Sequence, residues 1–244
     1  MKTRIDTAIT ELGYARSRTA AQRIIQEGIV LLNGKTVTKA SEIVDTESDS
    51  IEITQKPECM KYVGRGGFKL EKAIDAFNID LNGKCCLDIG ASTGGFTDCM
   101  LKNGAKRVFA VDVGKDQLDS SLRDNPAVIS LEQLDIRDAD NEITDKVDFI
   151  SIDVSFISLK LILPELRRFS AENSCGVALI KPQFENGKKK NGKHGVIRDP
   201  KVHKRITDDI CEFASGLGFT DISVIQSPIE GGDGNREFLM YFRI

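Results

Sequence analysis

Apolar runs of strand length alternate with helical patterns along the chain from about residue 67 to its end. This alternation constrains the fold more than any other feature, because strands that alternate with helices form a mostly parallel sheet with helices packed on its faces. The pattern predicts seven strands, near residues 85–89, 107–111, 127–131, 147–152, 175–180, 220–226 and 237–243. It also predicts a leading helix over about 70–77 and further helices near 94–103, 158–169 and 201–216. The expected fold class is therefore α/β, with a mostly parallel seven-stranded sheet over residues 67–244.

Residues 1–58 follow a different pattern, which predicts a small α+β domain. Apolar residues from Ile5 to Leu12 recur at helical spacing, and Ser17 is placed to cap a second helix that ends at Gly28. Asn33-Gly34 lies between two apolar runs and predicts a β-hairpin. Residues 59–66, next to Pro57 and rich in glycine, are expected to form a linker to the domain of residues 67–244.

The composition is typical of a globular protein, with 40% hydrophobic and 29% charged residues in a chain of 244. No apolar run approaches the ~20 residues that a membrane-spanning helix requires, and the N-terminus lacks the apolar stretch of a signal peptide. The six cysteines form no CxxC pair with nearby histidines, which argues against zinc and redox motifs. We therefore expect a cytoplasmic protein with no membrane partner and no metal.

The net charge of −3 conceals two basic segments. Residues 1–40 contain seven Lys or Arg against three acids, and residues 185–205 contain eight against two. Such local excesses in an acidic protein favour a localised anionic partner, although a charge run by itself is more often a solvated surface.

A glycine-rich turn follows the first strand of the expected sheet, in the sequence CCLDIGASTGGFTD. Glycines at 90, 94 and 95 allow a tight turn and close backbone approach before a helix begins. Ser92 and Thr93 stand where the dinucleotide motif has its second glycine, so a pyrophosphate-binding loop fits poorly, and an NAD-linked function is the weaker alternative.

Acidic residues follow this strand and its neighbours. Asp112, 22 residues after Gly90, is placed to accept hydrogen bonds from both hydroxyls of a ribose. Asp88 and Asp153 add negative charge at the carboxyl ends of strands, which suits a cationic ligand better than a phosphate. S-adenosylmethionine has this character, with a sulfonium and an α-ammonium group.

The series DIGASTGGFTD, VDVG and LDIRD resembles the motifs of class I methyltransferases. The resemblance implies that Asp112 holds the ribose of S-adenosylmethionine and that Asp135 and Ile136 flank its adenine. It implies that the methionine part is lined by six residues of the turn, namely Asp88, Gly90, Ser92, Gly94, Gly95 and Phe96.

Four ionisable residues form a further set: Lys69 before the leading helix, Asp153 at the end of ISID, Lys181 at the end of VALIK, and Glu237 in NREFLMYF. If the strands are as expected, Asp153 and Lys181 lie at the carboxyl ends of neighbouring strands, where ligands bind. The Lys-Asp-Lys-Glu set resembles the tetrad of FtsJ-like RNA ribose 2′-O-methyltransferases. Together with RGGFKLEKA, DVSFISL and IKPQFE, it is similar to the TlyA family, which implies methylation of a ribosomal RNA ribose, usually on cytidine.

A ribose 2′-hydroxyl is a poor nucleophile at neutral pH and must lose its proton as it attacks. We expect Lys181 to act as the base, since a desolvated lysine beside another cation can be neutral at that pH. Asp153 is expected to orient Lys181, while Lys69 and Glu237 position the substrate and each other.

The first domain resembles the RNA-binding domain named after ribosomal protein S-four, on its Ser-Arg, Gly-x-Val and Asn-Gly-Lys elements. The resemblance implies that it presents basic side chains to structured RNA, with Arg16, Arg18 and Arg23 clustered at the start of the second helix. The full set of expected RNA-binding residues is Arg4, Arg16, Arg18, Arg23, Lys35, Arg65, Lys193 and Arg198.

Three questions stay open. Phe156 and Phe184 suit stacking on a base or on adenine, and suit the core equally well. A catalytically silent RNA-binding assembly factor remains an alternative to the enzyme, and a membrane-active hemolysin is a weaker one, since the chain shows neither an apolar span nor a large-residue amphipathic basic helix. The short termini resemble those of the narrower type of the TlyA family, a resemblance that implies the large ribosomal subunit as the favoured partner.

Overall fold

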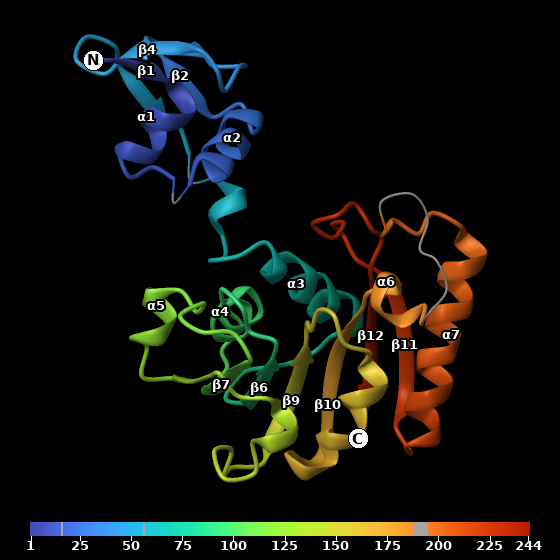
Figure 1. Cartoon of the computed structure of the whole chain (residues 1–244). Helices are drawn as coiled ribbons and strands as arrows, with labels where there is room; N and C mark the ends of the chain where they lie inside the picture. Colours follow the sequence, from blue (N-terminus) through green and yellow to red (C-terminus); the bar gives the residue numbers. More distant parts are fainter. Residues whose placement is uncertain (16, 56, 188–194) are drawn as a thin grey trace. The chain divides into compact units, whose positions relative to one another are not determined.

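The computed structural model describes residues 1–15, 17–55, 57–187 and 195–244, so the predictions at Arg16 and Lys193 lie outside the described residues. The chain divides into two compact units, Met1–Tyr62 and Val63–Ile244, and each is described by itself (Figure 1).

The first unit packs two helices against short antiparallel strands. Its core is formed by apolar residues of both helices, including Ile5, Ile9 and Ile24, which are fully buried. One small sheet pairs β1 with β4 and another has the order β3-β2-β5. Its elements are β1 (Lys2–Arg4), α1 (Ile5–Glu11), α2 (Arg18–Gln26), β2 (Val30–Leu32), β3 (Lys35–Thr36), β4 (Ile43–Asp45), β5 (Ile51–Ile53) and the 3₁₀ turn η1 (Glu58–Met60).

Two local predictions for this unit are confirmed. The Ser17 hydroxyl accepts a hydrogen bond from the Ala20 N–H at 3.2 Å, which caps α2. Asn33 and Gly34 both adopt positive φ, of 50° and 78°, and join β2 to β3. Two successive positive φ angles characterise the type I′ turn, whose twist matches that of the strands it connects.

The second unit contains, among the described residues, a seven-stranded sheet with the order β11-β12-β10-β9-β6-β7-β8. The strands from β10 to β8 are parallel, and β12 runs antiparallel to both β10 and β11. The strands are β6 (Cys85–Ile89), β7 (Arg107–Asp112), β8 (Val128–Glu132), β9 (Val147–Ile152), β10 (Ser170–Ile180), β11 (Thr220–Gln226) and β12 (Phe238–Arg243). The predicted fold class and all seven strands are confirmed.

Helices cover both faces of this sheet (Figure 1). Because side chains alternate along a strand, Leu87 and Ile89 face one layer while Asp88 faces the other. The first layer contains the long helix α7 (Pro200–Gly216), whose buried Ile206 and Ile210 join the same core as Leu87. The other helical elements of the second unit are α3 (Gly66–Phe77), α4 (Gly95–Lys102), α5 (Ser120–Arg123) and α6 (Pro182–Glu185), with 3₁₀ turns η2 (Ile136–Asp138), η3 (Leu159–Leu161) and η4 (Leu163–Arg168).

Two predicted helix positions were wrong. Residues 158–169 form η3 and η4 in place of one α-helix, because Pro164 has no N–H to donate to the carbonyl of residue 160. The leading helix α3 begins at Gly66, so Lys69 lies within its first turns and not before it. Gly66 and Gly67, in the glycine-rich segment that suggested a linker, are the first two residues of this helix. The first N–H groups of a helix need no intrahelical partner, and small residues at these positions permit close packing. An added Cβ on Gly95 would lie 3.0 Å from Gly67 N.

No helix in the described ranges is long and apolar enough to cross a membrane. The same residues contain no cluster of three or more His, Cys, Asp or Glu side chains arranged to hold a metal ion. Burial raises the pKa of the Cys86, Cys175 and Cys211 thiols, which keeps them protonated and unreactive.

Candidate active site

The turn after β6 has a backbone conformation that favours glycine. Three of its residues have positive φ, namely Gly90 at 82°, Ser92 at 49° and Gly94 at 92°. The Gly90 and Ala91 N–H groups donate to the Val111 carbonyl at 2.8 and 3.0 Å, which fixes the turn against the end of β7. Strained backbone of this kind persists only where its surroundings hold it, and it is common at ligand sites.

Asp112 ends β7 beside this turn. Its two carboxylate oxygens accept hydrogen bonds from Ser92 N and Gly114 N, each at 2.7 Å. These bonds fix the carboxylate while leaving further lone pairs on both oxygens. Asp112 is therefore fixed where it can accept the two hydroxyls of a ribose.

An open cavity of about 340 Å³ lies between the turn, Asp112 and the loop after β9, a volume within the range of small-molecule sites. Of the residues expected to hold the cofactor, it is lined by Gly90, Ser92, Asp112, Asp135 and Ile136. An adjoining cavity of about 190 Å³ continues along the turn past Gly95 and Phe96 to Asp153 and Lys181. The two cavities together provide an apolar slot beside the Asp112 carboxylate and a polar end, a shape and chemistry that fit S-adenosylmethionine.

The sequence did not single out several residues that line the larger cavity. Val113, Gln117, Leu134, Val154 and Ile157 contribute apolar or amide surface to it. They follow strand ends, where the sequence pattern signals only a loop. Arg137 forms an ion pair with Asp135 at 2.6 Å, and its hydrogen bonds lower the pKa of that carboxyl.

Two predicted cofactor contacts are not at either cavity. The Asp88 side chain is fully buried, and its oxygens accept hydrogen bonds from the hydroxyls of Thr97 at 2.6 Å and Ser151 at 2.8 Å. Gly94 also lies away from the cavities, since an added Cβ there would meet Leu122 Cδ1 at 2.2 Å. Both residues shape the turn from behind, because β6 points Asp88 into the layer that contains α4.

Burial raises the pKa of Asp88 from 3.8 to about 6. A carboxyl group with a raised folded pKa stabilises the protein below its unfolded pKa, and this stability is lost as the pH rises through the folded value. We expect Asp88→Asn, which cannot ionise, to gain stability relative to the parent protein between pH 4 and pH 7.5. The shift of about two pKa units corresponds to about 3 kcal/mol.

Urea unfolding of both proteins across this pH range measures the effect. Asp75→Asn, at an exposed position of α3, is the matched control and should show no such gain. Parallel stability curves for Asp88→Asn and the parent protein would contradict the burial effect.

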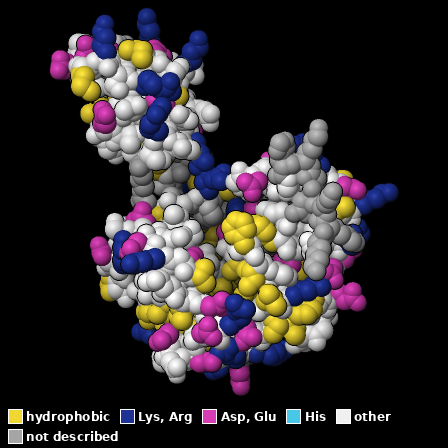
Figure 2. All heavy atoms as spheres, in the orientation of Figure 1, with side chains coloured by type: hydrophobic (Ala, Val, Ile, Leu, Met, Phe, Trp, Pro, Cys, Tyr) yellow, Lys and Arg dark blue, Asp and Glu magenta, His cyan; other side chains and the backbone are white. Residues whose placement is uncertain are grey.

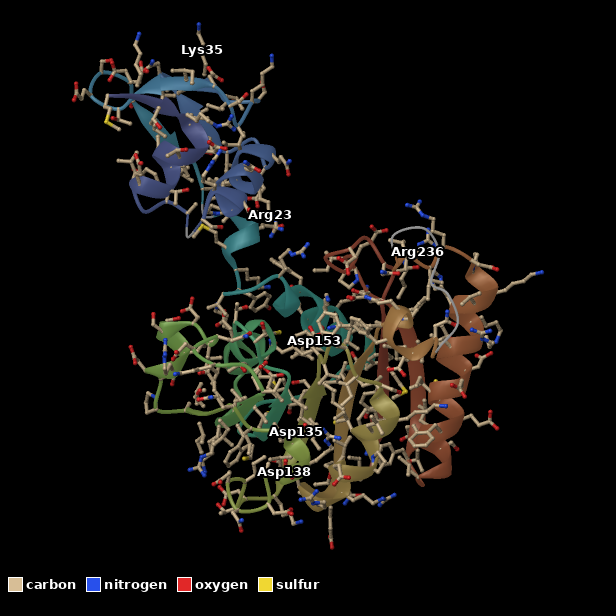
Figure 3. All side chains as sticks on the ribbon, in the orientation of Figure 1. Arg23, Lys35, Asp135, Asp138, Asp153 and Arg236 are labelled. Atoms are coloured by element: carbon tan, nitrogen blue, oxygen red, sulfur yellow. The ribbon has the colours of Figure 1, made fainter. Side chains whose placement is uncertain are left out.

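Asp153, labelled in Figure 3, and Lys181 lie together at the carboxyl edge of the sheet. They directly follow the neighbouring parallel strands β9 and β10, and Lys181 Nζ lies 2.6 Å from Asp153 Oδ1. The contact is an ion pair without hydrogen-bond geometry, and Lys181 Nζ donates its hydrogen bond to Ser155 Oγ at 2.8 Å. Ser155 was missed in the sequence, although it lies two residues after Asp153. Asp153 Oδ1 is buried and faces Lys181 Nζ, and the Asp153 side chain lines the smaller cavity.

Lys69 and Glu237 form the second ion pair of the site, with Lys69 Nζ donating to Glu237 Oε2 at 2.6 Å. Both side chains are buried. Ile180 pairs with Phe238 across β10 and β12, so Lys181 and Glu237, one residue beyond each, lie at the same edge of the sheet. The four residues therefore form two ion pairs, one at each side of β10.

The predicted RNA-binding arginines of the first unit are held by a carboxylate that the sequence did not single out. Asp6 is fully buried and accepts hydrogen bonds from Arg4 at 2.9 Å, Arg18 at 3.3 Å and Gln22 at 2.9 Å. Chiefly through the Arg4 hydrogen bonds, these contacts hold the pKa of Asp6 well below its usual range. Both guanidinium groups remain partly exposed, which leaves them able to contact an anion.

We expect Asp6→Ala to destabilise the first unit by about 1–3 kcal/mol, the usual cost of losing hydrogen bonds to a charged group. The carboxylate contributes above the unfolded pKa and its stability is lost as the pH falls through the lowered folded value, so the full effect is present at pH 7. Thermal unfolding at pH 7 measures it, with Glu11→Ala at an exposed position of α1 as the control. An Asp6→Ala variant as stable as Glu11→Ala would contradict this role.

The other predicted RNA contacts are spread over both units. Arg23 lies in the last turn of α2, so the expected cluster at the start of that helix is wrong for this residue. Lys35 lies at the end of the first unit opposite Arg23 (Figure 3). Figure 2 shows several basic side chains at the Lys35 end of this unit. Arg65 and Arg198 are exposed on the second unit. Arg236, which the sequence did not single out, is also exposed and directly precedes Glu237.

Comparison with known proteins gives consistent matches to both units. Residues 62–244 match the FtsJ-like methyltransferase family, and residues 3–51 match the S4 domain. The chain is 44% identical over 242 residues to "Putative rRNA methyltransferase YqxC" of Bacillus subtilis, covering 98% of this chain and 85% of the relative. It is 38% identical over 243 residues to 16S/23S rRNA (cytidine-2′-O)-methyltransferase TlyA of Mycobacterium tuberculosis, covering 99% and 90%. A solved "Putative hemolysin from Streptococcus thermophilus" is similar with a TM-score of 0.75 at 42% identity, covering 99% and 88%.

Proposed function

The chain belongs to the FtsJ-like methyltransferase family, and we propose that it methylates a ribose 2′-hydroxyl of ribosomal RNA with S-adenosylmethionine as methyl donor. The resemblance to the TlyA family and to the S4 domain is confirmed by the matches along both units. The observation that carries the proposed reaction is the presence of two ion pairs at one edge of the sheet, Lys181–Asp153 at the smaller cavity and the buried Lys69–Glu237 on the other side of β10.

Different residues of the cofactor site would contact the ribose, the adenine and the methionine part of the donor. Asp112 would accept the ribose hydroxyls, and Asp135 and Ile136 would flank the adenine. Gly90, Gly95 and the Asp153 carboxylate would receive the methionine part and its cationic groups. When bound, S-adenosylmethionine supplies an electrophilic methyl group on a sulfonium.

In the form in which Nζ has lost its proton, Lys181 is placed to accept the proton of the 2′-hydroxyl, while the hydroxyl oxygen would bond to the methyl carbon and the bond between that carbon and the donor's sulfur would break. Asp153 lies against Lys181 Nζ and stabilises the ammonium ion that results. Ser155 restricts Lys181 to one orientation, because its hydroxyl accepts a hydrogen bond from Nζ. Lys69 and Glu237 hold one another rigidly on the far side of β10, where they position the target ribose.

The substrate assignment rests on the first unit and on the relatives. Its S4 domain presents Arg4 and Arg18, oriented by Asp6, to RNA phosphates. The name of the Mycobacterium relative, which covers both 16S and 23S rRNA, supports a cytidine target. The large subunit as the preferred partner is supported by a relative from Campylobacter jejuni, 36% identical over 242 residues, that is named a 23S rRNA (cytidine-2′-O)-methyltransferase. Phe156, exposed at the rim of the larger cavity, is positioned to stack on the target base.

The test is methyl transfer from tritiated S-adenosylmethionine to unmodified large and small ribosomal subunits. After alkaline hydrolysis of the large-subunit RNA, we expect tritium in alkali-resistant fragments when the parent protein is used. We expect no such label with Lys181→Met. Label confined to the small subunit would overturn the subunit assignment. A protein that binds the donor and both subunits but transfers no label would show a catalytically silent RNA-binding factor.

A further inference from the structure

Phe156 is held in a conformation that its own backbone disfavours. Its φ is +64°, in the left-handed region that a bulky residue rarely adopts, and its side chain is 91% exposed. Burial of the ring therefore cannot be what stabilises this conformation. Other contacts of the loop after β9 must hold it, because strained backbone persists only where its surroundings determine it.

Glu185 supplies those contacts. Its carboxylate accepts a hydrogen bond from the Ser158 hydroxyl at 2.6 Å with one oxygen, and from Leu159 N at 2.8 Å with the other. The Ser158 hydroxyl in turn accepts a hydrogen bond from Lys160 N at 3.2 Å, which caps η3. Both oxygens of a single carboxylate thus bind the segment just beyond Phe156.

Glu185 also lies on the element that carries the proposed base. It ends α6, which begins one residue after Lys181, and the ring of its neighbour Phe184 lies 5.0 Å from that of Phe156. One end of the Phe156 loop is bound at Asp153 and Ser155 by Lys181, and the other end is bound at Ser158 and Leu159 by Glu185. The exposed ring lies between the two attachments.

We propose that Glu185 is a positioning residue, whose carboxylate fixes the loop after β9 so that Phe156 is presented to the target nucleoside in register with Lys181. The inference rests on the proposed function for the identity of the substrate, but the structural link between Glu185 and Phe156 does not depend on it. The consequence is that Glu185 affects substrate binding without contacting the substrate.

The structural link is tested without substrate. The chain contains no tryptophan, so Phe156→Trp introduces a single fluorescent reporter at this position. We expect Glu185→Ala and Ser158→Ala in this background to lower the fluorescence anisotropy of the tryptophan, and Glu212→Ala, at an exposed position of α7, to leave it unchanged. Unchanged anisotropy in Glu185→Ala, with an unfolding temperature near that of the parent, would overturn the inference whatever the enzyme's substrate.

The functional link is tested by a double-mutant cycle on methyl transfer. Glu185→Ala is expected to raise KM for the ribosomal subunit about tenfold, the usual effect of losing hydrogen bonds to a charged group, with donor affinity unchanged. Phe156→Ala should raise KM similarly, and the double variant should show no further increase. A KM for the double variant raised by the product of the two single-variant factors would overturn the inference, because the two residues would then act independently. Absence of methyl transfer by the parent protein would instead contradict the proposed function, while the anisotropy result would still decide the structural link.

Discussion

Lys181→Met is expected to lower kcat for methyl transfer by about 10²–10⁴-fold, the usual contribution of a general base. Methionine preserves most of the length and apolar volume of lysine but cannot accept the 2′-hydroxyl proton. Lys181 is nearly buried, with a side chain 10% exposed, so solvent cannot readily replace it as the proton acceptor. Ser155→Ala, which removes only the hydrogen bond that orients Nζ, should lie between the parent protein and Lys181→Met.

Single-turnover rates with saturating subunit and donor measure this effect. The dissociation constant of the donor, measured by calorimetry, must remain within about twofold of the parent value, which shows that the cofactor site is intact. Lys106→Met, exposed at the opposite edge of the sheet beside the start of β7, is the matched control and should react at the parent rate. A Lys181→Met variant that reacts within tenfold of the parent would exclude Lys181 as the base.

Gly90→Ala is expected to weaken donor binding and to slow methyl transfer by about 100-fold, the usual effect on rate of displacing the reacting groups by about 1 Å. Gly90 has a φ of +82°, and an added Cβ would lie 2.5 Å from the carbonyl oxygen of Asp153 and 3.3 Å from Val154 Cα. These are backbone atoms, so relief requires the end of β9 to move away from the turn. The substitution therefore displaces the cofactor turn and Asp153 together.

Gly83→Ala separates this steric effect from backbone strain. Gly83 has a φ of +72°, in the same unit, but an added Cβ would meet nothing within 4 Å. We expect Gly83→Ala to lose stability while binding the donor at the parent affinity, measured by calorimetry. Equal donor affinities for the two variants would contradict the close packing of Gly90 on Asp153.

The sheet and the site edge could be predicted from the sequence because their signals are local. Apolar runs between turn residues indicated each strand, and the parallel arrangement placed Asp153 and Lys181 together. The antiparallel pairing of β12 with β10, which brings Glu237 to this edge, was not predicted, and only the family resemblance placed Glu237 in the site. Hydrophobic periodicity does not encode strand order.

The supporting contacts could not be predicted because they join distant segments. Asp88 was expected at the cofactor, but its partners Thr97 and Ser151 hold it behind the turn. Asp6 and Glu185 carry no local motif, and their importance lies in hydrogen bonds to side chains and backbone elsewhere in their units. The left-handed conformation of Phe156 has no sequence signal either, since a bulky residue there is unfavourable by itself.

The most direct measurement of the central claim is the identity of the modified nucleoside. Large ribosomal subunits are incubated with the protein and methyl-deuterated S-adenosylmethionine. Their RNA is then digested to nucleosides, which are separated and identified by mass spectrometry. We predict deuterated 2′-O-methylcytidine from the parent protein and its absence with Lys181→Met. Deuterium on the base of any nucleoside, with none on a ribose oxygen, would contradict ribose methylation by this site.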